Sequence, residues 1–136
     1  MPKLGLLENL ESLSPLETLN GYFENLSFTM FLRSIRYFGT DDQVKEWMPR
    51  VLKLQILGSY AQTELGHGSN VQGLETTATF DQDTDEFIIH SPTVSSTKFW
   101  PGNLGKATTH ALVIAKLILN SKVKGQQMFI VPLRNV

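Results

Sequence analysis

The chain has 136 residues, a formal net charge of −1, 41% hydrophobic residues, 18% charged residues and no cysteine. These values are typical of an ordinary globular protein with a core, and no block of like charge suggests nucleic-acid binding. Without cysteine the chain has no disulfide, no thiolate metal site and no cysteine nucleophile. No apolar run approaches bilayer-spanning length, and residues 1–14 lack the basic and apolar segments of a secretory signal.

A first helix is predicted from Ser14, which can cap it, with Pro15 in the first turn and Glu17 completing a capping box. Gly39 is placed to end it. The residues at the three-and-four spacing of one helix face are Leu16, Leu19, Phe23, Leu26 and Met30. From Phe28 onward the pattern is apolar on most sides, which predicts that this half is buried between partners.

A second helix is predicted from the capping signal Thr40-Asp41-Asp42-Gln43, whose acids suit a helix N-terminus. It should run to about Met48, with Pro49 kinking it or beginning another turn. The helical pattern gives way to an extended one near Leu54 to Ile56.

The rest of the chain has the pattern of β-strands. Two hairpins are expected, one around the turn Asp81–Asp85 and one around Asn120–Gly125. The expected strands are Ile56–Thr63, Thr76–Phe80, Glu86–His90, His110–Leu119 and Gln127–Pro132. This order predicts an α+β fold, with a helical segment over residues 1–54 and an antiparallel β domain over residues 55–136.

The stretch Tyr60–Phe80 has the strongest functional pattern. Its loop contains Gly66, Gly68 and Gly73, and glycines at that density let a backbone approach a flat ligand closely. The polar residues able to hydrogen bond there are Gln62, Thr63, Glu64 and Ser69.

Other motifs fail on spacing. Gly66-His67-Gly68 lacks the third glycine of a dinucleotide fingerprint, and Gly105-Lys106 is followed by Ala107 where a phosphate loop needs Ser or Thr. The acids of the turn Asp81–Asp85 imitate a calcium loop, but Glu86 replaces its obligatory glycine. The three histidines have no metal-ligand spacing, so no metal site is expected.

Two blocks of sequence resemble the peroxisomal acyl-CoA oxidases, which use a flavin. The first is YAQTELGHGSNVQGLETTATF, Tyr60–Phe80, and the second comprises Ser91-Pro92-Thr93, Lys98-Phe99-Trp100-Pro101-Gly102 and Leu104-Gly105-Lys106. The resemblance extends from about Thr40 to Leu133, is weaker for the preceding helix and is absent at the extreme N-terminus. The related acyl-CoA dehydrogenases have a looser version of the first block, with Thr-Glu-Pro where this chain has Thr63-Glu64-Leu65. Gly66-His67-Gly68 and Trp100-Pro101-Gly102 favour the oxidases.

This resemblance implies the end of an N-terminal helical domain followed by an incomplete antiparallel β-barrel, with FAD as cofactor. It implies that Thr63 and Gly102 contact the flavin and that Trp100 packs near it. Each residue also has a structural reading: threonine is common in strands, Pro-Gly is a common turn and a Phe-Trp pair is usually core. The two blocks in order favour the cofactor reading for Thr63 and Gly102, and leave Trp100 evenly balanced.

The implied parent activity is oxidation of fatty acyl-CoA to trans-2-enoyl-CoA in peroxisomal β-oxidation, with electrons passed to O2 to give H2O2. The implied general base is a glutamate in a C-terminal helical domain outside this chain. Glu64 and Glu75 do not match it, so no catalytic residue is assigned. We expect a fragment that is inactive alone, from a parent that is a homodimer without a membrane span.

Two alternatives stay open. The parent could be an acyl-CoA dehydrogenase that passes electrons to a carrier protein. The chain could instead be a short, catalytically dead paralogue that acts as an interaction module. The C-terminal Arg134-Asn135-Val136 is not a peroxisomal address of the Ser-Lys-Leu type, which is compatible with the second alternative.

Overall fold

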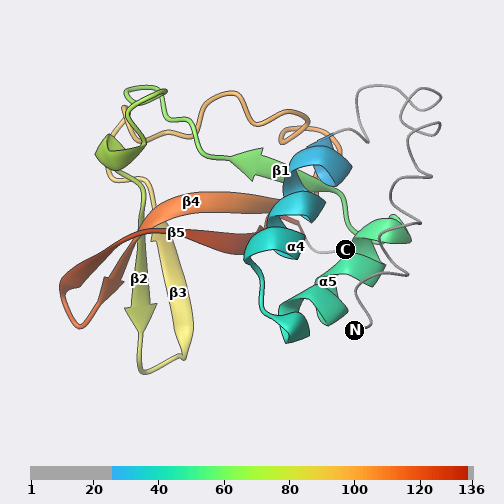
Figure 1. Cartoon of the computed structure of the whole chain (residues 1–136). Coiled ribbons are helices and arrows are strands. Elements are labelled where there is room, and N and C mark those ends of the chain that lie inside the picture. The colour runs from blue at the N-terminus through green and yellow to red at the C-terminus, as the bar shows by residue number, and fades with distance from the viewer. Residues whose placement is uncertain (1–25, 135–136) are drawn as a thin grey trace.

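The computed structural model describes residues 26–134, in which helices lie at one end of a sheet (Figure 1). The π-helix η1 (Ser27–Leu32) runs directly into α4 (Arg33–Phe38). Gly39 ends this helix as predicted, in an extended conformation with its N–H donating to the carbonyl of Ile35 at 2.8 Å. The predicted helix start at Ser14 lies outside the described residues.

Helix α5 (Asp41–Leu52) begins as predicted and ends later than predicted. Thr40 and Gln43 form the expected capping box. Pro49 lies inside the helix, which continues beyond Met48 because Val51, fully buried, is needed in the core.

The C-terminus of α5 is a Schellman motif, a type of helix end that glycine usually makes. Leu54 has a φ of 55° and its N–H donates to the carbonyl of Val51 at 2.9 Å, while the N–H of Gln55 donates to that of Arg50 at 2.9 Å. Because leucine fills the left-handed position, the sequence offers no glycine to mark where this helix ends.

The core joins the helices to the sheet. Its main cluster consists of Phe31, Leu32, Ile35, Met48, Val51, Ile56, Leu74, Leu112 and Ile114. Gly58 allows the Phe31 ring to lie against the first strand, because a Cβ at this glycine would stand 2.1 Å from that ring. Beside it, the Ser27 hydroxyl accepts from the N–H of Gly58 at 2.8 Å and donates to its carbonyl at 2.9 Å.

The sheet has five strands: β1 (Gly58–Ala61), β2 (Thr77–Asp81), β3 (Glu86–His90), β4 (His110–Leu119) and β5 (Lys122–Pro132). β5 lies along one edge of β4, and β1 and then β2 lie along the other. The prediction of an antiparallel sheet is wrong for two pairings, because β1 and β2 both run parallel to β4. Among the pairings of these five strands, β2–β3 and β4–β5 are antiparallel, and each of these pairs is a hairpin joined by a short turn.

The strand bounds differ from the prediction in two places. β1 is shorter than the expected Ile56–Thr63. The second hairpin turns at Asn120-Ser121, with φ values of 49° and 60°, so β5 begins at Lys122 and not at Gln127. Two successive residues with positive φ make the tight turn that suits the twist of a hairpin. The usual sequence signal for this turn is Asn-Gly, and because the chain has Asn120-Ser121 instead, the position of the turn could not be predicted.

The sheet is not closed within the described residues. β3 pairs only with β2 there, and its side chains Phe87 and Ile88 are exposed. Phe87 lies between Phe80 and Phe129, with ring centroids 5.2 and 5.1 Å away. No helix of the part that the structure describes is long and apolar enough to cross a membrane.

We predict that Gly58→Ala destabilises the chain by about 3 kcal/mol or more, because the added methyl group collides with a buried ring and the core must open to admit it. Gly68→Ala is the matched control, because a Cβ there meets nothing within 4 Å. Urea unfolding of both variants checks this, and equal loss in the two would contradict the Phe31 contact.

We also predict that stability falls on mild acidification because of His110. Burial, and then the charge of Arg50, lower the pKa of this histidine below its usual 6.5. The unfolded chain then binds the proton more readily, so stability is complete above pH 6.5 and is lost as the pH falls toward the folded-state pKa. In urea titrations across this range, His110→Gln should reduce the pH dependence; an unchanged slope would rule the histidine out as its source.

Candidate functional site

The structure brings the two blocks singled out in the sequence into direct contact. The N–H of Phe99 donates to the carbonyl of Thr63 at 2.9 Å, and that of Leu65 donates to the carbonyl of Thr97 at 3.0 Å. The N–H of Gly66 donates to the carbonyl of Ser95 at 2.9 Å. These bonds, with the β-bridge between Glu64 and Lys98, make a short antiparallel ladder between segments that are distant in the sequence; Glu64 and Lys98 are 34 residues apart.

Thr63 and Trp100 lie beside this ladder with groups available to a ligand. Within residues 26–134, the half-buried Thr63 uses its carbonyl while its hydroxyl makes no hydrogen bond. Trp100 is 84% exposed and has a φ of 76°. An aromatic residue in the left-handed region is a strained outlier, and such strain clusters at functional sites. The core reading of Trp100 is therefore wrong.

Gly102 has a structural explanation that the sequence did not offer. Its carbonyl accepts from the Ser59 hydroxyl at 3.0 Å, which ties the loop to β1. A Cβ at Gly102 would lie 2.3 Å from Cδ1 of Leu26. The absence of a side chain at Gly102 thus leaves room for Leu26, the residue directly before η1.

The glycines of the first loop also serve different purposes. A Cβ at Gly66 would lie 2.9 Å from Cβ of Ser95, and one at Gly73 would lie 2.5 Å from the Asn70 amide nitrogen. These two glycines are needed for packing within the loop. Only Gly68 borders open space, so the argument that the loop glycines admit a flat ligand holds for this one residue.

Sequence reasoning missed the role of the ion pair between Glu64 and Lys98. Lys98 Nζ lies 3.1 Å from Oε1 of Glu64, and the two side chains are 11% and 0% exposed. The carboxylate also accepts from the backbone N–H groups of Glu75 at 2.7 Å and Thr76 at 2.9 Å. Glu64 had been grouped with the residues facing a ligand, and a single glutamate followed 34 positions later by a lysine gives no signal of such a pair.

Both pKa values at this pair follow from burial and hydrogen bonding. Burial alone would raise the pKa of Glu64, but hydrogen bonds from Glu75, Thr76 and Lys98 outweigh it and lower that pKa. Burial lowers the pKa of Lys98, and Glu64 partly offsets the effect. Glu64 is therefore held as a carboxylate by three hydrogen bonds.

A polar cluster adjoins the pair. Glu75 Oε2 accepts from the hydroxyls of Ser95 at 2.5 Å and Thr93 at 3.2 Å, and lies 3.6 Å from Nε2 of His67. Glu64, His67 and Glu75 could offer ligand atoms within 4.8 Å of one another, a grouping that the sequence spacing did not suggest. The Glu64 oxygens already accept hydrogen bonds, so we assign this cluster to loop packing and not to a metal.

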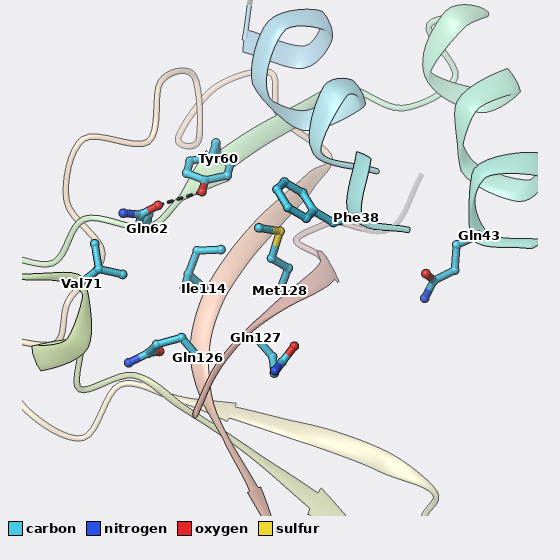
Figure 2. Close-up of a pocket in the computed structure, with 9 residues that line it drawn as sticks. All are labelled: Phe38, Gln43, Tyr60, Gln62, Val71, Ile114, Gln126, Gln127 and Met128. Atoms are coloured by element: carbon cyan, nitrogen blue, oxygen red, sulfur yellow. Dashed lines mark hydrogen bonds between the residues drawn. The ribbon is translucent and has the colours of Figure 1, made fainter. Parts of the chain in front are cut away.

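A groove of about 580 Å³ opens beside the ladder, between α4 and the strands β1, β4 and β5 (Figure 2). Its lining residues are Phe38, Gln43, Tyr60, Gln62, Val71, Ile114, Gln126, Gln127 and Met128. The Tyr60 hydroxyl donates to the Gln62 side-chain oxygen at 2.7 Å. Gln62 directly precedes Thr63, so the groove borders the segment that carries the candidate site.

Comparison with known proteins gives one consistent result. The family model described as acyl-coenzyme A oxidase N-terminal matches residues 15–57. A putative peroxisomal acyl-coenzyme A oxidase 1.2 of Arabidopsis thaliana is 58% identical over 114 residues, 84% of this chain and 17% of that protein. Human peroxisomal acyl-coenzyme A oxidase 1 is 50% identical over 111 residues, 82% of this chain and 17% of that protein.

Solved structures agree. The tomato acyl-CoA oxidase has a TM-score of 0.81 and 60% identity, over 83% of this chain and 17% of that chain. A Caenorhabditis elegans acyl-CoA oxidase-2, solved with FAD, ascaroside-CoA and ATP, has a TM-score of 0.81 and 43% identity, over 85% of this chain and 17% of that chain.

The chain belongs to the acyl-CoA oxidase family. It spans 17% of the length of the curated relatives it matches first, and so corresponds to one segment of such a protein. The helices followed by an open sheet match the end of the N-terminal helical domain and the start of the β domain, which confirms the predicted fold class.

We predict that Trp100→Gly changes the free energy of unfolding by no more than about 1 kcal/mol, because the loss of an exposed ring is offset by relief of the left-handed backbone. Trp47→Gly, in the core contact of α5, should cost about 3 kcal/mol or more. Urea unfolding compares the two. If Trp100→Gly lowers the free energy of unfolding as much as Trp47→Gly does, Trp100 is a core residue and the prediction is wrong.

Proposed function

We propose that this chain supplies one wall of the flavin site of an FAD-dependent acyl-CoA oxidase. In this proposal residues 1–54 belong to the N-terminal helical domain and residues 55–136 to the flavin-facing β domain. The observation that carries it is the contact between the two blocks, which places the free Thr63 hydroxyl and the exposed Trp100 ring beside the same ladder.

The residues present fit a flavin in their chemistry. A free hydroxyl is a ready hydrogen-bond donor, and an exposed indole offers an aromatic face to a flat ring. Gly68 borders open space on the same loop. The FAD and ascaroside-CoA of the nematode relative support the same cofactor and a CoA thioester as substrate.

The chemistry assigned to this chain is electrostatic support. FAD, when bound, supplies the acceptor for a hydride removed from the substrate. The hydroxyl or the backbone N–H of Thr63 would donate a hydrogen bond to the edge of the bound cofactor, and the Trp100 ring would pack near that edge. Gly102 holds its loop against β1 through Ser59. No residue of this chain is assigned as the general base.

The activity proposed for the whole protein is oxidation of fatty acyl-CoA to trans-2-enoyl-CoA, with O2 reduced to H2O2. The names of the relatives support a peroxisomal location. A homodimer is proposed for the parent. The segment alone is proposed to be inactive and to bind FAD weakly or not at all, because it provides one wall of the site.

A chimaera tests this proposal: the matching segment of the tomato oxidase is replaced by this chain's own residues. The chimaera should bind FAD and form peroxide with an acyl-CoA. Thr63→Val should lower kcat by about 100-fold, because a donor to developing charge is lost. Thr79→Val, the same change in β2, should leave kcat unchanged.

Four results would each contradict part of the proposal. A chimaera that binds no FAD would contradict the proposal that this chain supplies part of the cofactor site. Dye reduction without peroxide would identify a dehydrogenase. Equal kcat values for Thr63→Val and Thr79→Val would remove Thr63 from the site. A stoichiometric flavin spectrum from the purified 136-residue chain would overturn the weak binding proposed for the segment alone.

A further inference from the structure

The Lys98 ammonium group has three acceptors, one for each of its donors. These are the carbonyl of Gln62 at 3.0 Å, Oε1 of Glu64 at 3.1 Å and the carbonyl of Ile114 at 2.7 Å. All three donors of the ammonium group are therefore used, and both oxygens of Glu64 accept hydrogen bonds.

The position of Ile114 explains why a lysine is suited to this place. Val113 is the last residue of β4 that pairs with β1, and Lys116 is the first that pairs with β2. Ile114 thus lies in the gap between two strands that share one edge of β4. Lys98 reaches into that gap and bonds the β4 backbone where neither strand does.

The pair also surrounds Thr63. Lys98 bonds the carbonyl of the residue before it, Gln62, and the side chain of the residue after it, Glu64. The next residue after Lys98, Phe99, donates its N–H to Thr63 itself at 2.9 Å. Trp100 follows directly. Lys98 therefore holds the residues on both sides of Thr63, and Trp100 lies two residues after this lysine.

Stability alone does not account for a buried ion pair here. Replacing such a pair by apolar residues of similar volume is often neutral or stabilising, because the charges must be desolvated. An apolar side chain could fill this space, but it could not hold three acceptors from two segments, residues 62–64 and β4, in fixed directions. An ammonium group can.

We propose that Glu64 and Lys98 are positioning residues of the flavin site, which set the separation and orientation of Thr63 and Trp100 toward the cofactor. This inference rests on the proposed function. Reacting groups must be placed within a fraction of an ångström, since a misplacement of about 1 Å can cost about 100-fold in rate. The charged hydrogen bonds of this pair provide that placement.

The test uses the tomato chimaera with Lys98→Met, and Lys45→Met as matched control. Among the residues that the structure describes, Lys45 makes an exposed ion pair with Asp42 at 3.5 Å. Lys98→Met should remain folded by circular dichroism, bind FAD about tenfold more weakly and lose about 100-fold in kcat, with little change in the KM for acyl-CoA. Lys98→Arg, which keeps charge and several donors, should recover most of both losses. Lys45→Met should match the unchanged chimaera.

A folded Lys98→Met chimaera with unchanged FAD affinity and kcat would overturn the inference and leave the proposed function intact. Failure of Lys98→Arg to recover either quantity would also overturn it. If Lys98→Met does not yield folded protein, Lys98→Gln, which keeps a shorter neutral donor, carries the same comparison with the same contradicting result. An unchanged chimaera that binds no FAD would instead defeat the proposed function, and this inference with it.

Discussion

The backbone pairing of β4 is the constraint on which the other described elements depend. The strand β4 is buried from His110 to Ala115 and pairs with three other strands. β1 and β2 pair one after the other with the same edge of β4. The chain that connects them therefore leaves that edge after β1 and returns to it at β2. The loop of residues 62–76 makes this connection, and the second block lies against it. The candidate site is thus a product of strand order.

Several elements could be predicted because their causes are local. The capping box of Thr40 and Gln43, the helix end at Gly39 and the first hairpin each depend on a few neighbouring residues. The later end of α5 could not be predicted, because Leu54 occupies a position where glycine is the usual signal. The parallel pairings could not be predicted either, since strand order is set by contacts distant in sequence.

The candidate site shows the same division. The two blocks were recognised as related, and the structure places them in contact. The reasons given for individual residues changed more. Gly102 is required by Leu26, Gly66 by Ser95, and Glu64 is a buried anchor and not a ligand-facing group. Sequence patterns give residue type and spacing, whereas these roles depend on which side chain arrives from another segment.

The free edge of the sheet has a practical consequence. β3 carries Phe87 and Ile88 in an exposed position and, in the part of the chain that the structure describes, pairs on one side only. Unpaired backbone groups beside apolar side chains form a template for adding another strand from any chain nearby. Made separately, the segment therefore presents an edge that favours aggregation.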